Sequence, residues 1–159
     1  MKTAYFTHGT HGMQLTQPVT AQRGFTLIEV MIVFFVLSVG LLGMAALQMK
    51  SMQYNQSSYI RSQATVAAYD MLDRMRVNKT EALAGAYDIA FGATPPGGTS
   101  VTATDLQQWT AFLGNTLPNG QGHVSCGASQ CTVEISWTDR IPDSAGNPVT
   151  PVISFTVQL

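Results

Sequence analysis

The feature that most constrains this chain is an apolar run close to its N-terminus. Residues 25–47 read FTLIEVMIVFFVLSVGLLGMAAL, and Glu29 is the only ionisable side chain among them. As a helix this run would be about 35 Å long, enough to cross the hydrocarbon core of a bilayer. Apolar residues occupy every face of that helix, as expected where lipid or other helices surround it. The run therefore predicts a membrane-spanning helix that also packs against other subunits.

The segment before the run is predicted to be a leader. Residues 1–24 are polar, rich in Thr, Gln and Gly, and show no periodicity. A secretory signal would place its small-residue cleavage site after a short apolar region. Here the small residue, Gly24, comes before a long one. A start at Met13 would shorten the leader and leave the same mature chain.

Composition argues against several classes of function. Charged residues make up 11% of the chain, whereas about a quarter is usual for a soluble domain. The net charge is −1, and it falls to about −3 once the two cations of the leader are removed, so no nucleic-acid partner is expected. No catalytic constellation, metal site or cofactor is predicted. His123 is the only histidine after the leader, and Asp70 and Asp73 read as a helix surface.

The helix is predicted to continue beyond the apolar run and to become amphipathic over residues 48–77. Asp70 with Arg74, and Asp73 with Arg76, have the spacing of neighbours on one helix surface. The helix would end near Asn78 after about 50 residues. Apolar residues at spacings of three and four predict one buried stripe: Ile60, Ala64, Ala67, Ala68, Met71, Leu72 and Met75.

A second, shorter helix is predicted after a Pro/Gly/Thr loop at residues 92–103. Thr104 has the character of an N-cap, and Gln107 stands three residues later as its capping-box partner. The helix would run to about Asn115. Its buried residues would be Leu106, Trp109 and Leu113.

The remainder reads as strands. Residues 123–126 and 131–138 flank a four-residue turn, and residues 152–159 alternate apolar and polar side chains. The prediction is an α+β fold in which the long helix covers a three- or four-stranded antiparallel sheet. The inward-facing side chains would be Val133, Ile135, Trp137, Ile153, Phe155, Val157 and Leu159.

The two cysteines, Cys126 and Cys131, fall across from each other in this hairpin. A C-x4-C pair supplies only half a zinc site, and outside the cytoplasm a disulfide is the better interpretation. Closing so short a loop stabilises by only about 2 kcal/mol. The bond would fix the hairpin register rather than carry the fold.

Glu29 needs a physical explanation, because a carboxylate at the centre of a bilayer costs about 2.5–3.5 kcal/mol. Its place near a helix N-terminus lowers that cost. Cleavage after Gly24 would also create an α-amine on Phe25, one helical turn from Glu29. That amine could pair with Glu29 of the same chain or of a neighbouring subunit, and a pair of this kind would set the register between subunits.

The sequence Arg23-Gly24-Phe25-Thr26-Leu27-Ile28-Glu29 resembles the class III signal of type IV prepilins. This resemblance implies that a prepilin peptidase cuts between Gly24 and Phe25 and N-methylates Phe25, and that Glu29 is needed for subunit recruitment. Residues 55–64 and 68–76 resemble the minor pilins of the PilV family. That resemblance implies a pilin fold and a low-abundance subunit that helps to initiate pilus assembly.

The implied organisation has three parts: a leader at 1–24, a transmembrane and assembly helix at 25–47, and a globular domain at 48–159 outside the cytoplasm. The implied partners are the prepilin peptidase, other minor pilins, the major pilin and the inner-membrane assembly platform. The subunit would cross the inner membrane once before assembly and then lie in the pilus at the cell surface.

Three other interpretations stay open. A pseudopilin of a type II secretion system shares the signal and the architecture. A membrane-anchored enzyme or ligand-binding domain would keep the helix without assembling. A pilus-tip subunit for adhesion or DNA uptake would present the loops at 92–103 and 127–130.

Overall fold

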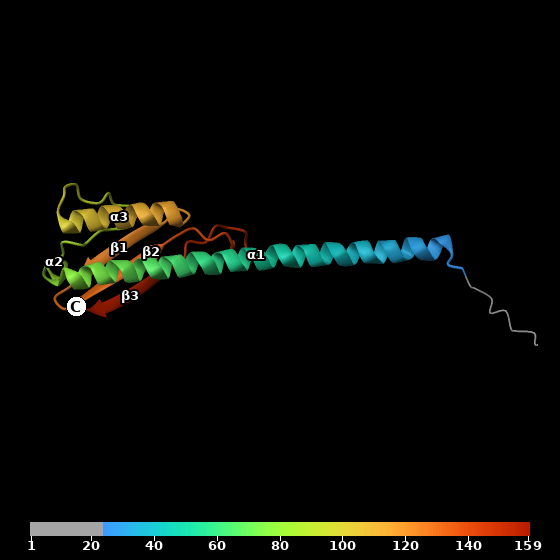
Figure 1. The fold of residues 1–159 in the computed structure, drawn as a ribbon, viewed down its shortest axis with the longest axis horizontal. Helices are drawn as coiled ribbons and strands as arrows, with labels where there is room; N and C mark the ends of the chain where they lie inside the picture. Colours follow the sequence, from blue (N-terminus) through green and yellow to red (C-terminus); the bar gives the residue numbers. More distant parts are fainter. Residues whose placement is uncertain (1–23) are drawn as a thin grey trace, which may run out of the picture. The chain divides into compact units, whose positions relative to one another are not determined.

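The computed structural model describes residues 24–159 and divides between Leu42 and Gly43 into two units. The predicted leader, apart from Gly24, and the alternative start at Met13 lie outside the described residues. Along the chain the elements follow the order α1, α2, α3, β1, β2, β3 (Figure 1).

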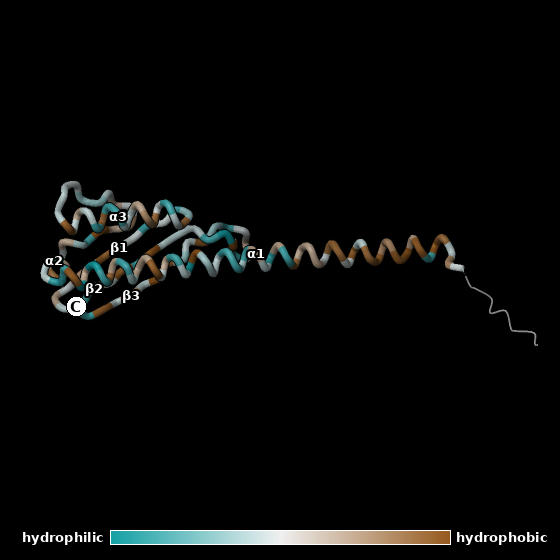
Figure 2. Tube along the Cα trace, viewed as in Figure 1, coloured by the Kyte–Doolittle hydropathy of each residue, from teal (hydrophilic) through white to brown (hydrophobic). Residues whose placement is uncertain are grey.

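Helix α1 (Leu27–Val77) contains 51 residues, which confirms the predicted long helix and its end before Asn78. Its N-terminal part, up to Leu42, forms the first unit and is exposed at every residue. Figure 2 shows this half of α1 coloured as hydrophobic along nearly its whole length. The apolar side chains of this half therefore have no core of their own.

The C-terminal half of α1 buries one stripe, as its sequence periodicity predicts. The charged pairs lie outside that stripe, with Arg74 Nε 2.9 Å from Asp70 Oδ2 and Arg76 paired with Asp73. The buried residues are the seven predicted ones: Ile60, Ala64, Ala67, Ala68, Met71, Leu72 and Met75.

The chain after α1 contains structure that the sequence pattern did not predict. A five-residue helix, α2 (Lys79–Leu83), follows Asn78 directly. Ile89 then forms an isolated antiparallel bridge with Val124, with N–H to O distances of 3.0 and 2.9 Å. Tyr87 is fully buried beside it in the core cluster. This segment extends the sheet by one bridge.

Helix α3 (Val101–Thr116) begins earlier than predicted, so the N-cap prediction of Thr104 is wrong. Ser100 is the N-cap, and its Oγ accepts a hydrogen bond from Ala103 N at 3.2 Å. The earlier start buries Ala103 and converts the end of the predicted loop into helix. Gln107 caps no helix end and donates from Nε2 to Pro96 O at 2.8 Å.

The predicted core of α3 is confirmed, because Leu106, Trp109 and Leu113 are all buried. Trp109 also donates from Nε1 to Ala67 O on α1 at 2.9 Å. This bond fixes α3 against the C-terminal half of α1 by satisfying the indole N–H in a buried position.

The sheet has three antiparallel strands in the order β1-β2-β3, within the predicted range. They are β1 (Gln121–Cys126), β2 (Gln130–Ser136) and β3 (Val152–Gln158). Strand β2 ends at Ser136, two residues earlier than predicted, and beyond it Thr138 N donates to Pro118 O at 2.8 Å. Trp137 is nevertheless buried.

The core of the second unit lies between the helices and one face of the sheet (Figure 1). Val133 and Ile135 of β2 are fully buried there, whereas Ile153 and Phe155 of β3 are only half-buried. The α+β prediction, with a long N-terminal helix packed on an antiparallel sheet, is confirmed.

Candidate functional site

The junction predicted to be cut lies in exposed backbone outside the helix. Gly24, Phe25 and Thr26 precede the first helical residue, Leu27, and Phe25 is 83% exposed. A Cβ added at Gly24 would meet no atom within 4 Å, so crowding among the described residues does not require glycine there.

The first turn of α1 places Glu29 immediately after this junction. Thr26 caps the helix: its Oγ1 accepts from Glu29 N at 3.3 Å, and its carbonyl accepts from Glu29 N at 3.1 Å and from Val30 N at 3.3 Å. The carboxylate of Glu29 thus lies where the helix dipole favours negative charge. None of the ion pairs within residues 24–159 includes Glu29.

Thr26 is a functional candidate that the sequence interpretation missed. Its signal was present, because Thr26 and Glu29 have the Thr-x-x-Glu spacing of a capping box. Hydropathy alone hides this signal, because Thr26 is a single polar residue at the start of an apolar run.

The apolar segment after Glu29 has the length and composition of a membrane span. Gly40 and Gly43 within it have open space around them, so an added Cβ would meet nothing. Ser38 satisfies its hydroxyl by donating to Phe34 O at 2.6 Å, which suits an apolar environment. The exposed apolar side chains of this segment are suited to contact with lipid or with other helices.

At the hairpin between β1 and β2, the structure joins Cys126 and Cys131 by a disulfide. The two residues are also register partners in the sheet, and Cys126 N donates to Asp88 Oδ1 at 2.8 Å. Leu159 N donates to Ser129 O at 3.2 Å, so the end of the chain lies on the same turn. The disulfide therefore holds a turn that three segments share.

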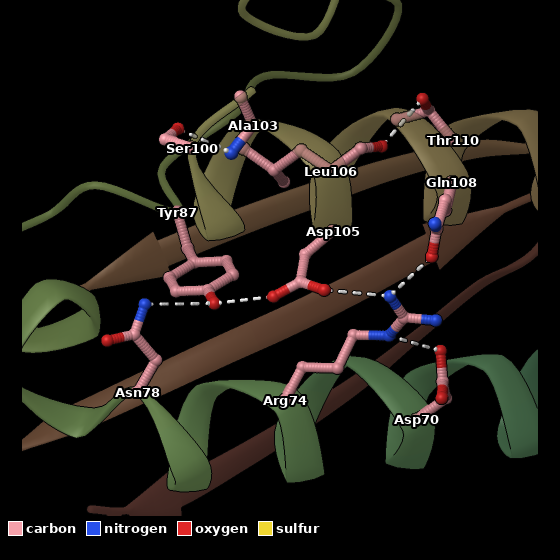
Figure 3. Close-up of polar contacts among 10 residues, drawn as sticks. All are labelled: Asp70, Arg74, Asn78, Tyr87, Ser100, Ala103, Asp105, Leu106, Gln108 and Thr110. Carbon is pink, nitrogen blue, oxygen red and sulfur yellow. Dashed lines mark hydrogen bonds and ion pairs between the residues drawn. The ribbon is translucent and has the colours of Figure 1, made fainter. Parts of the chain in front are cut away.

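A polar network joins α1, α3 and the segment after α2 (Figure 3). Arg74 donates to Asp105 Oδ1 at 2.9 Å and to Gln108 Oε1 at 3.1 Å, in addition to its contact with Asp70. Tyr87 donates from its hydroxyl to Asp105 Oδ2 at 2.7 Å. Asp105 thus receives donors on both carboxylate oxygens and ties the three segments together.

Two pKa values in this network are displaced. Burial raises the pKa of Tyr87, and the negative charge of Asp105 raises it further against the opposing hydrogen bond from Asn78. Burial alone would lower the pKa of Arg74, but Asp105 and Asp70 outweigh it and raise the pKa. Both groups keep their neutral-pH protonation state in the folded protein, as expected of a structural network.

The described residues offer little for catalysis or metal binding. Residues 24–159 contain no cluster of three or more His, Cys, Asp or Glu side chains suited to a metal ion. His123 Nδ1 lies 3.1 Å from Glu134 Oε2 on the neighbouring strand, a cross-strand contact. Asp70 and Asp73 pair with arginines, as the sequence predicted, and not with each other.

Comparison with known proteins finds a sequence motif at the N-terminal end of the apolar run. Residues 20–45 match the family model described as the prokaryotic N-terminal methylation motif. No curated protein and no solved structure matches the chain. The motif supports a type IV pilin-like or pseudopilin subunit, and the α+β fold is consistent with a pilin. Such a signal implies processing by a prepilin peptidase and contact with membrane-embedded pilus machinery.

Proposed function

We propose that this chain is a minor pilin of a type IV pilus, a structural subunit without enzymatic activity. The observation that carries the proposal is the position of Glu29. It is the one carboxylate in an exposed apolar helix, and it lies in the first turn, directly after the glycine junction covered by the methylation motif. The resemblance of residues 55–76 to the PilV family supports the minor-pilin assignment.

The proposed processing step cuts the Gly24–Phe25 bond and methylates the new α-amine of Phe25. The backbone supports this assignment, because both residues are exposed and lie outside the helix. The open space around Gly24 means that a glycine requirement would come from the peptidase rather than from contacts among the described residues.

The proposed assembly step uses the charge pair between Glu29 and the α-amine of Phe25. In the membrane each charge is costly alone, and docking of one subunit beside another lets the carboxylate of one meet the amine of the next. Because the pair forms only at one axial offset, it selects the register of the incoming subunit.

The proposed domain organisation keeps the boundary that the hydropathy of the sequence predicts, between residues 47 and 48. Residues 25–47 would span the inner membrane and later line the filament core, and residues 48–159 would fold outside the cytoplasm. The Cys126–Cys131 disulfide supports an oxidising compartment. The partners would be the prepilin peptidase, the inner-membrane assembly platform, the major pilin and the other minor pilins.

A type II secretion pseudopilin is the second candidate, because the same motif serves both systems. The two differ in where the mature subunit accumulates. Filaments sheared from the cell surface would contain a minor pilin at low abundance, whereas a pseudopilin would stay with the cell envelope. A tip role in adhesion or DNA uptake would be an additional property of the minor pilin.

Exchange of Glu29→Gln tests the proposal, with Glu81→Gln on the exposed surface of α2 as the matched control. Leaving one member of a buried pair uncompensated costs about 3–5 kcal/mol, which corresponds to a loss of about 100-fold or more. We expect E29Q to be cleaved normally and to fall by that factor in sheared filaments, with E81Q unchanged. Normal incorporation of E29Q would refute the pairing.

A further inference from the structure

Between the apolar run and the globular fold lies a helical segment that neither of them accounts for. Residues 48–56 of α1 are exposed, and the first buried position of the helix is Ile60. The first hydrogen bonds that join α1 to other segments lie at Gln56 and Ser57, where Arg140 donates to Gln56 Oε1 at 3.3 Å and Ser57 donates to Asp139 Oδ2 at 2.8 Å. Residues 48–55, here called the interfacial segment, have no cover in the folded unit.

The composition of the interfacial segment fits a boundary between hydrocarbon and water. Gln48, Lys50 and Gln53 are too polar for the hydrocarbon core, whereas Met52 and Tyr54 are apolar or amphipathic and are 73% and 57% exposed. Tyrosine is enriched where membranes meet water, because its ring prefers the apolar side and its hydroxyl the polar side. Lysine extends its ammonium toward the headgroups while its stem stays apolar.

The charge pattern selects the lipid surface over a generic partner. Residues 30–69 include Lys50 and Arg61 and contain no acidic side chain. The Arg61 guanidinium lies 6.0 Å from the ring centre of Trp137, so it belongs to the globular unit. Lys50 is then the cation of the interfacial segment, and no acid within nineteen residues on either side of it in the sequence competes with lipid phosphate.

The length of the interfacial segment is sufficient to cross the headgroup layer of a bilayer. At 1.5 Å per residue, Lys50 lies about 4–5 Å beyond Leu47 along the helix and Tyr54 about 10 Å beyond it. The headgroup layer on each side of a bilayer is about 5–8 Å thick. The eight residues of the interfacial segment, about 12 Å of helix, therefore cross this layer and place Gln56 and the first contacts of the globular unit just above it.

We propose that the interfacial segment seats the subunit in the headgroup layer of the outer leaflet, with Lys50 bound to lipid phosphate and Tyr54 where the headgroups meet water. This inference rests on the proposed membrane span at residues 25–47. It adds a surface that fixes how deep the helix lies in the membrane. Incorporation into a filament must release this surface from lipid.

The depth of α1 in the membrane can be measured at four exposed serines along the helix: Ser38, Ser51, Ser58 and Ser62. Each is replaced singly by cysteine and spin-labelled in the full chain, in vesicles of phosphatidylethanolamine with phosphatidylglycerol. Collision with oxygen and with a water-soluble nickel chelate reports depth. We expect hydrocarbon values at Ser38, phosphate-level values at Ser51, and bulk-water values at Ser58 and Ser62.

The charge reversal Lys50→Glu adds a test of lipid binding, with Lys79→Glu on α2 as control. With phosphatidylglycerol present, K50E should move the Ser51 label toward water, and the shift should vanish in phosphatidylcholine vesicles. K79E should leave the depth of the Ser51 label unchanged in both kinds of vesicle. If the label at Ser38 has the collision rates of hydrocarbon and the label at Ser51 those of bulk water, the headgroup inference is wrong but the membrane span stands. If the label at Ser38 has the collision rates of water, the membrane span is wrong as well.

Discussion

The two halves of α1 contain similar side chains and use them in opposite ways. In the N-terminal half, taken here as residues 27–47, apolar residues occupy every face and all of them are exposed, including Met44 at 61%. In the C-terminal half they are confined to one stripe, and Met71 in that stripe is fully buried. The difference lies in the period of the pattern, which separates a surface made for an external medium from one made for the core of its own chain.

The largest effect should come from truncating the same residue type in the two halves. Met71→Ala removes a fully buried side chain and should lower the free energy of unfolding of the globular unit by about 2–5 kcal/mol. Met44→Ala should change it by less than about 0.5 kcal/mol, because its side chain is exposed. Denaturant unfolding of the detergent-solubilised chain, followed by tryptophan fluorescence, measures both. Equal losses would contradict the division between the halves.

Glycines sharpen the same comparison. A Cβ at Gly122 would collide with the Trp109 ring and lie 2.8 Å from Leu113 Cδ1, whereas Gly40 in the apolar half has open space. Gly122→Ala should therefore destabilise by about 1–3 kcal/mol. Gly40→Ala should leave the globular unit unchanged and strengthen the helix by about 0.5–1 kcal/mol. Thermal unfolding and helical circular dichroism in micelles distinguish them. A neutral G122A would refute the close contact.

The polar network of the globular unit should give stability a dependence on high pH. Because the pKa of Tyr87 is raised above its ordinary value of 10.0 in the fold, the unfolded chain loses this proton first. Stability should be constant from neutral pH to about 9 and fall as the pH passes 10. Tyr87→Phe should remove this fall and cost about 0.5–1.5 kcal/mol at neutral pH, through the lost bond to Asp105.

The exposed Tyr59 is the control for this prediction. Tyr59→Phe should leave the alkaline fall in place, since its side chain is 62% exposed. Chemical unfolding at a series of pH values gives both curves. An unchanged alkaline fall in Y87F would contradict the assignment to Tyr87.

The smallest effect should appear at the start of the apolar half. Thr26→Val keeps the side-chain shape and removes the hydroxyl that accepts from Glu29 N. Loss of an N-cap costs about 1 kcal/mol, so exchange of the Glu29 amide should accelerate about fivefold. Thr26→Ser should restore the slow rate. Hydrogen exchange by NMR in micelles measures it, and equal rates in T26V and T26S would exclude capping by the hydroxyl.

Much of the fold could be predicted because the helical and strand periods are long and regular. Seven residues of the α1 stripe recur at three and four, and only one helix phase buries them all. The start of α3 was missed because Ser100 and Thr104 are both good caps, and burial of Ala103 decides between them. Helix α2 is too short to show a period.

The candidate site also contains one part that the local sequence predicts and one part that it does not. The placement of Glu29 in the first turn follows from the local pattern. The Tyr87–Asp105–Arg74 network does not, because its members are separated by 18 and 31 positions and meet only when the helices pack. Local sequence determines which half of α1 is apolar, and tertiary packing determines which polar residues meet.

The measurement that tests the central claim most directly is N-terminal mass spectrometry of the protein in sheared surface filaments. The account predicts a chain that begins at Phe25 with one methyl group on its α-amine, at low abundance relative to the major subunit. A filament-incorporated chain that still carries residues before Phe25 would contradict it, and so would one that begins at Phe25 without the methyl group.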